Sequence, residues 1–173
     1  GALDVIWEAV GIYRGLAEGN VKAFKPDLAM SLSNLSNRLS EMGDRGGALE
    51  VIREAVGIYR GLAEGNAAAF KSVLAGSLSN LSNRLSEVGD RGGALKAVRE
   101  ATKIYHGLVE GNAEAFIPVL ARSLNDLSSR LSDLGDRGGA LDAAREAVGI
   151  YRGLVEGNAS NSSTPASRVA GVT

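Results

Sequence analysis

A repeat of 46 residues constrains this chain more than any other feature of its sequence. The string Gly-Ala-Leu begins at residues 1, 47, 93 and 139, and residues 1–46 and 47–92 differ at only eight positions. The third copy, 93–138, has diverged further, and the fourth stops after about twenty residues. Equal spacing of near-identical units predicts an array in which each unit packs against its neighbours.

Each unit contains two helical patterns. The first runs from Pro26 to Met42, where large apolar residues recur on one helix face, at Leu28, Leu32, Leu35, Leu39 and Met42. We place its start at Pro26, because proline suits the first turn of a helix. We expect Gly43 to end it in the left-handed conformation and Asp44 to cap the next helix.

The second pattern ends at Gly65-Asn66 and carries apolar residues at helical spacing: Ala48, Leu49, Ile52, Ala55, Val56, Tyr59 and Leu62. No stretch alternates apolar and polar residues, so strands are not expected. The Gly-Asp-Arg turn is short enough to force antiparallel hairpins, and stacked hairpins form an open superhelix. We therefore predict an all-α fold of about seven helices in residues 1–157, followed by a disordered polar tail in residues 158–173.

Charge and composition exclude several classes of function. The 19 basic and 20 acidic residues are interleaved, which argues against a basic face for nucleic acid or anionic lipid. No apolar run approaches the roughly 18 residues that span a bilayer, so no membrane association is expected. The absence of cysteine permits a reducing compartment, and we expect a cytoplasmic protein. Because the chain begins at Gly1 within the repeat pattern, we expect it to be part of a longer protein.

No residue pattern indicates catalysis, a metal or a cofactor. The single histidine, His106, stands where the other copies have Arg14, Arg60 and Arg152, so we expect it on the surface. The glycines of Gly43–Gly47 lack the Lys-Ser/Thr that a phosphate-binding loop requires. Carboxylates recur beside basic residues, as at Arg53-Glu54, which indicates charge-balanced helix faces. We predict that the chain is not an enzyme.

Glycines inside the second helices fall into two groups. Gly11 and Gly57 correspond to Lys103, so a long side chain fits there and the position is expected to be exposed. The other group is the same in all four copies and is expected where a neighbouring helix approaches closely: Gly15, Gly61, Gly107 and Gly153.

Asparagines in the first helices are the most informative polar residues. Asn34 and Asn37 lie one turn apart beside the leucine stripe, Asn80 and Asn83 repeat them, and the third copy has Asp126 and Ser129. Asparagine is a mediocre helix former, so two in each helix need a reason. One interpretation is that these asparagines are polar surface residues that the helix tolerates, or that they form hydrogen bonds between adjacent repeats. The other is that the amides bind the N–H and C=O groups of an extended peptide.

Gly43-Asp44 followed by Ala48, Ile52 and Ala55 resembles the tetratricopeptide repeat, and the match recurs after Gly89-Asp90 and Gly135-Asp136. The resemblance covers about nine tenths of the chain. The period is 46 residues instead of about 34, and we place the extra residues between hairpins, in Gly65–Ser72. Among known variants, the long repeats of kinesin light chain are similar.

The resemblance implies a right-handed superhelix and a non-enzymatic scaffold that binds a peptide or protein segment in the groove of the first helices. The groove residues would be Asn34, Asn37, Asn80, Asn83, Arg122 and Asp126. The lysines of a carboxylate clamp have no counterpart at Ser33 or Ser79, which argues against recognition of a free C-terminus.

The alternative is an architectural spacer or a self-assembling array. The helix at the start of the chain is the second helix of its unit, and its apolar residues Leu3, Ile6, Val10 and Tyr13 have no preceding helix to cover them. Trp7 adds apolar surface at this end. At the other end of the array lie Ala144, Val148 and Tyr151. Because the copies are nearly alike, the sequence predicts head-to-tail association into open chains. A saturable partner in a pull-down would distinguish the two functions.

Overall fold

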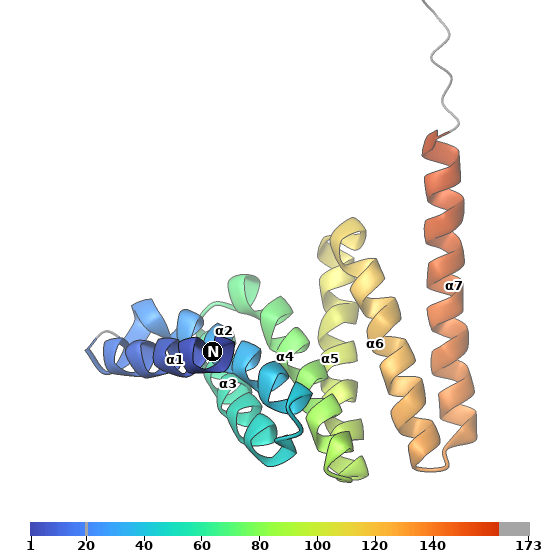
Figure 1. Ribbon diagram of the computed structural model, residues 1–173. Helices are drawn as coiled ribbons and strands as arrows, with labels where there is room; N and C mark the ends of the chain where they lie inside the picture. Colours follow the sequence, from blue (N-terminus) through green and yellow to red (C-terminus); the bar gives the residue numbers. More distant parts are fainter. Residues whose placement is uncertain (20, 163–173) are drawn as a thin grey trace, which may run out of the picture.

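Seven helices follow one another over residues 1–19 and 21–162, the part of the chain that the computed structural model describes. They are α1 (Ala2–Gly19), α2 (Val21–Glu41), α3 (Arg45–Gly65), α4 (Ala67–Glu87), α5 (Arg91–Gly111), α6 (Ala113–Asp133) and α7 (Arg137–Ser162). Each helix packs against the next, and the helix axes turn progressively from α1 to α7 (Figure 1). No strand occurs in these residues, which confirms the predicted all-α array of antiparallel hairpins.

The turn inside each hairpin has the predicted chemistry. Gly43 has a φ of +86°, in the left-handed region, and its equivalents in the next two hairpins have φ values of +86° and +82°. The Asp44 side chain then accepts a hydrogen bond from the N–H of Gly47 at 2.9 Å. The same cap recurs at Asp90 and Asp136. A left-handed glycine and an aspartate cap therefore reverse the chain between α2 and α3.

The junction between successive hairpins is shorter than predicted. Asn66 alone separates α3 from α4: its N–H donates to the carbonyl of Leu62, and its side chain accepts from the N–H of Ala69 at 3.1 Å. Of the extra residues 65–72, residues 67–72 therefore lengthen the first helix instead of forming a linker. The prediction that Pro26 begins its helix was also wrong, because α2 begins at Val21 and tolerates the proline inside.

The last helix extends beyond residue 157. Helix α7 continues to Ser162, so residues 158–162, assigned to the tail, are helical. The remainder of the predicted tail, residues 163–173, lies outside the described part of the chain.

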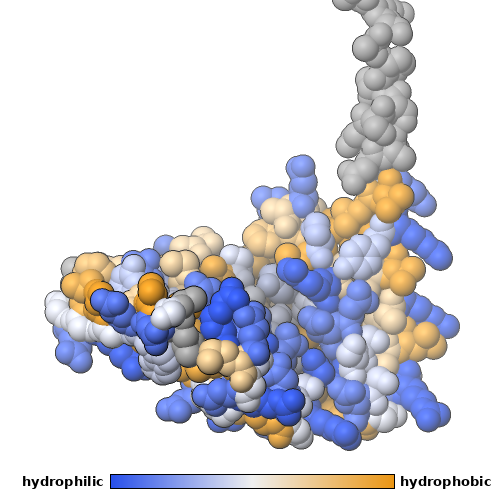
Figure 2. All heavy atoms as spheres, in the orientation of Figure 1, coloured by the Kyte–Doolittle hydropathy of each residue, from blue (hydrophilic) through white to orange (hydrophobic). Residues whose placement is uncertain are grey.

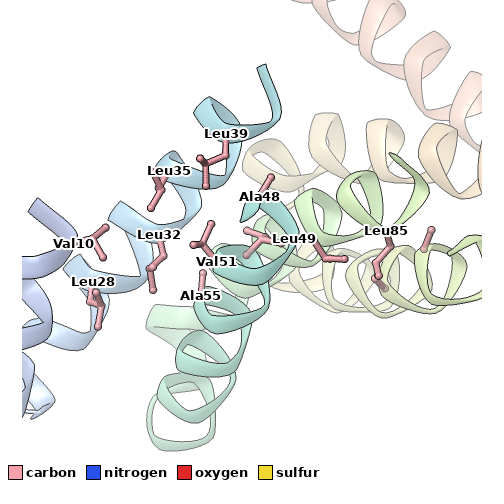
Figure 3. Close-up of a cluster of buried hydrophobic side chains, with 13 residues drawn as sticks. Val10, Leu28, Leu32, Leu35, Leu39, Ala48, Leu49, Val51, Ala55 and Leu85 are labelled. Carbon is pink, nitrogen blue, oxygen red and sulfur yellow. The ribbon is translucent and has the colours of Figure 1, made fainter. Parts of the chain in front are cut away.

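The core runs along the array between the two rows of helices. Leu32 and Leu35 of α2 are fully buried against Ile52 and Ala55 of α3, and Val10 of α1 joins the same cluster (Figure 3). The leucine stripe is thus confirmed, except that Met42 lies after the end of α2 and is exposed. The prediction that Val10 is uncovered was wrong, because α2 covers it; Trp7 on α1 is exposed, as predicted.

The glycines that are the same in all copies do not mark a close approach of helices. A Cβ atom built on Gly15, Gly61, Gly107 or Gly153 would have no atom within 4 Å outside its own helix backbone. The prediction for these four positions was wrong: they lie on the solvent-facing side of the second helices, as Gly57 does. Nothing in the packing explains why they are glycine.

Candidate functional site

The predicted groove residues gather mainly in one hollow of about 500 Å³ on the row of first helices. Five of the six line it, and they come from α2, α4 and α6: Asn34, Asn80, Asn83, Arg122 and Asp126. We call this hollow the central groove. The sixth, Asn37, lines a separate hollow of about 400 Å³ beside Val5, Ile6 and Ala9 of α1. Asn34 lines both.

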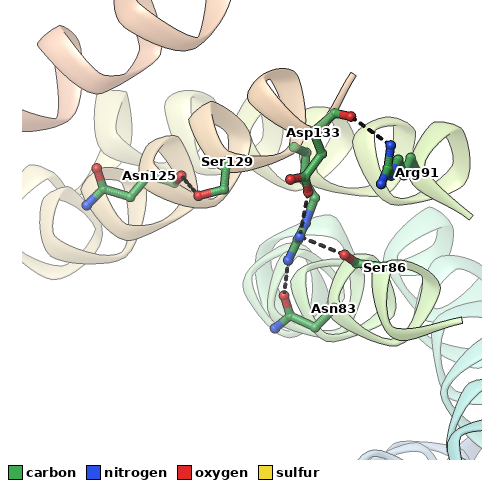
Figure 4. Close-up of polar contacts among 7 residues, drawn as sticks. Asn83, Ser86, Arg91, Asn125, Ser129 and Asp133 are labelled. Atoms are coloured by element: carbon green, nitrogen blue, oxygen red, sulfur yellow. Dashed lines mark hydrogen bonds and ion pairs between the residues drawn. The ribbon is translucent and has the colours of Figure 1, made fainter. Parts of the chain in front are cut away.

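The asparagines differ in what they already bind. The Asn83 side-chain oxygen accepts a hydrogen bond from Arg130 Nη2 at 3.1 Å, and the same guanidinium donates to Ser86 at 2.8 Å and pairs with Asp133 at 3.2 Å (Figure 4). Asn83 therefore joins α4 to α6. No hydrogen bond recorded in the described residues involves the side-chain amides of Asn34 or Asn80. Asn83 thus fits the interpretation that the asparagines form hydrogen bonds between adjacent repeats. The side-chain amides of Asn34 and Asn80, in contrast, are open to a ligand.

Two tyrosines, which the sequence suggested only as core residues, form part of the central groove. Tyr59 and Tyr105 reach it from the second helices α3 and α5 and are almost completely buried. Burial raises the pKa of both phenols; nearby Asp27 raises the pKa of Tyr59 further, and Arg122 opposes the rise at Tyr105. The signal was available, because all four copies carry tyrosine at this position.

Gly76 on α4 lies beside the Tyr105 hydroxyl. A Cβ atom built on Gly76 would lie 3.6 Å from that hydroxyl oxygen, which is an ordinary van der Waals distance. Val73 and Val119 add apolar surface to the groove. The central groove therefore combines open amides with phenol and apolar surface, which suits a ligand that has both a polar backbone and apolar side chains.

The α6 part of the central groove is charged. Arg122 is exposed, and Asp126 is half-buried at the position that holds asparagine in the first two copies. Burial raises the pKa of the Asp126 carboxyl, and the guanidinium groups of Arg130 and Arg122 partly oppose the rise. The groove thus changes from neutral amides at α2 and α4 to two charged side chains at α6.

Several other charged residues form pairs between successive repeats. Arg14 and Arg60 bind Glu54 and Glu100 of the following repeat at 2.5 and 2.8 Å. His106 takes the place of arginine in the third pair, with its Nε2 atom 3.3 Å from Glu146, and it is exposed as predicted. These glutamates therefore pair with residues of the preceding repeat.

Metal binding and membrane insertion can also be considered for the described residues. No group of three or more histidine, aspartate or glutamate side chains in the described ranges is placed to hold a metal ion. None of the helices there is both long and apolar enough to cross a bilayer.

Comparison with known proteins gives one informative match. A family model described as tetratricopeptide repeat matches residues 28–63, 74–109 and 120–158. Among solved structures, the crystal structure of MamA is 14% identical, covers 85% of this chain and 89% of its own, and has a TM-score of 0.34. BtubC from P. vanneervenii is 16% identical, with coverage of 99% and 95% and a TM-score of 0.31. At such scores these likenesses support no functional argument. No curated protein matches the sequence.

Proposed function

This chain belongs to the tetratricopeptide repeat family, as the predicted resemblance indicated, and from that premise we propose that it binds an extended segment of another protein in the central groove. Repeats of this family act in general as scaffolds for protein–protein interactions, and such scaffolds are typically not enzymes. The groove, its occupant and a cytoplasmic location are the parts we propose.

One observation carries the proposal: Asn34 and Asn80 present side-chain amides in the same groove, and neither amide has a hydrogen bond recorded in the described residues. An amide supplies both a donor and an acceptor, the pair that a peptide unit of an extended chain needs. Equivalent positions on successive first helices would bind successive parts of such a chain. The floor around Tyr59 and Tyr105 would receive its apolar side chains.

The test replaces both amides, as Asn34→Ala with Asn80→Ala. A binding partner is first captured from native lysate with the unaltered protein, and its bound segment is then titrated as a synthetic peptide by calorimetry. We expect binding to weaken by about 1–3 kcal/mol, the scale for losing hydrogen bonds to buried polar groups. Circular dichroism should show an unchanged helix content.

Asn125→Ala is the matched control, because Asn125 is an exposed asparagine of α6 that does not line the central groove. Its affinity for the peptide should equal that of the unaltered protein. If the double variant binds the peptide as tightly as the unaltered protein does, the two amides take no part in binding, and the partner binds elsewhere on the array.

The second candidate function, an architectural array that assembles with itself, is favoured by a different observation. Large apolar side chains on α7 remain exposed where their equivalents in earlier repeats are buried. This function is supported if the protein captures only further copies of itself from native lysate.

A further inference from the structure

Within the described residues, one face of α7 lacks the cover that every earlier second helix has. The side chain of Val148 is 48% exposed, whereas its equivalents Val10, Val56 and Thr102 are 1%, 4% and 4% exposed. Tyr151 is 39% exposed, against 6% and 7% for Tyr59 and Tyr105. Each of those helices is covered by the first helix that follows it. Apolar surface is visible along α7 in Figure 2.

Two arginines of α7 also lack the partners that their equivalents have. Arg45 and Arg91 donate to the carbonyl groups of Glu87 and Asp133, at the C-terminal end of the first helix that follows. Arg137 is the equivalent of this pair on α7. Arg152 is the equivalent of Arg14 and Arg60, which bind glutamates of the following second helix. The described residues give Arg137 and Arg152 no such partner.

The opposite end of the array offers those missing groups. On the side that faces the start of the array, helix α2 is covered by α1 alone, because α1 has no first helix beside it in the described residues. The Arg38 side chain of α2 is therefore 55% exposed, whereas its equivalents Arg84 and Arg130 are 12% and 17% exposed. Arg130 shows what a preceding first helix supplies, since it donates to Asn83 and Ser86 of α4.

We propose that helices α6 and α7 of one molecule dock on α2 and α3 of a second copy, in the place that α1 holds in the isolated chain. Residues 1–19 and 139–157 differ at only four positions, and Val10, Tyr13 and Arg14 recur as Val148, Tyr151 and Arg152. In this register Arg152 meets the second copy's Glu54. Arg137 likewise meets the carbonyl of Glu41.

Helix α6 adds contacts that α1 does not provide. Arg38 of the second copy would face Ser129 and Ser132, which occupy the positions of Asn83 and Ser86. Both hydroxyls can accept hydrogen bonds from a guanidinium. A two-helix hairpin therefore competes with the single helix α1 for the same surface. The contact is heterologous and leaves the same two surfaces free at the ends, so copies join into open chains.

Direct docking of α7 on α1 is the competing register, and the array argues against it. A second helix is followed by a first helix at every step, and α1 and α7 are both second helices. The two registers predict different effects for Val5, which is 65% exposed on α1 and is not covered by α2. In our register α1 leaves the surface of α2 and α3, so a substitution at Val5 does not affect assembly.

The experiment is sedimentation velocity of the full chain at increasing concentration. We expect mass to grow with concentration and Val148→Asp to abolish the growth, with unchanged thermal unfolding of the monomer because Val148 is exposed. Val5→Asp should assemble as the unaltered protein does. Val10→Asp should assemble at lower concentration, because it loosens α1 from α2.

Loss of assembly in Val5→Asp would overturn the proposed register in favour of direct docking. Assembly that survives Val148→Asp, or the absence of assembly in both the unaltered protein and Val10→Asp, would overturn the proposal itself. The chain has no cysteine, which permits a direct check. A mixture of Arg152→Cys and Glu54→Cys molecules, treated with a short bis-maleimide, should yield a covalent dimer of one molecule of each kind. No such dimer is expected if the two residues do not meet.

Discussion

At the scale of single residues, position 34 of the repeat shows how one substitution changes the groove. Asn34 and Asn80 are neutral, whereas Asp126 places a carboxylate at the same half-buried position of α6. Burial raises the pKa of this carboxyl in spite of two nearby guanidinium groups. The folded state therefore binds the proton of Asp126 more tightly than the unfolded chain does, and folding becomes less favourable once the group must ionise.

We accordingly predict that Asp126→Asn stabilises the fold at neutral pH, by up to about 1 kcal/mol. The free-energy cost of ionising Asp126 in the folded state is absent below the ordinary aspartate pKa of 3.8. It grows as the pH rises through the raised pKa that this carboxyl has in the folded state. The gain should therefore vanish at about pH 3, where aspartate is protonated in both states. Urea unfolding at the two pH values measures the difference. A gain of the same size at both would show that the charge is not its cause.

Residues whose role depends on sequence neighbours could be predicted, and residues whose role depends on a distant partner could not. Gly43 and Asp44 were assigned correctly because a left-handed stop and an N-cap are local structures. The partner of Asn83, in contrast, is Arg130, 47 residues away in the next repeat. Only the packing of α4 on α6 decides that Asn83 is occupied while Asn34 and Asn80 remain open.

At the scale of helices, the lengths were predicted less well than the number. Pro26 was taken as a helix start, but α2 begins five residues earlier and α4, with Ser72 in that place, has the same length of 21 residues. The boundary comes from Asn66 and Asn112, each of which ends one helix and caps the next. A single residue with both roles leaves no loop whose composition would mark the junction.

The exposed glycines of the second helices lead to a prediction about helix stability. Gly57 and Gly61 of α3 have open space where a Cβ atom would lie. Replacing both by alanine should therefore raise the free energy of unfolding by about 0.5–1 kcal/mol for each residue, because alanine loses less backbone entropy in a helix. Urea unfolding monitored by circular dichroism provides the measurement.

Gly43→Ala is the matched control, since it makes the same chemical change at a φ of +86°. It should destabilise the fold by about 1–2 kcal/mol, the cost of a Cβ atom in the left-handed region. Destabilisation by Gly57→Ala and Gly61→Ala would instead mean that these glycines serve a contact that forms only in an assembly.

At the scale of the whole molecule, stability should be a sum over repeats and their interfaces. Each helix contacts mainly its neighbours in the chain, so no extensive contact joins the two ends of the array in the described residues. The ion pairs, caps and buried leucines recur with the same period, and an additional repeat would meet the same surfaces on both sides. This property separates a repeat array from a globular domain, where an insertion of similar size would interrupt one common core.

We therefore predict that a second copy of residues 47–92, inserted after Gly92, will fold as an added hairpin and stabilise the protein. The insertion adds 46 residues to 173, so the urea m-value should rise by roughly a quarter, because it scales with the surface exposed on unfolding. The helical signal per residue should stay constant. A scrambled insertion of the same composition is the control and should leave the m-value unchanged. If the true repeat behaves like the scrambled one, the interfaces between repeats depend on the third copy's divergent residues and are not interchangeable.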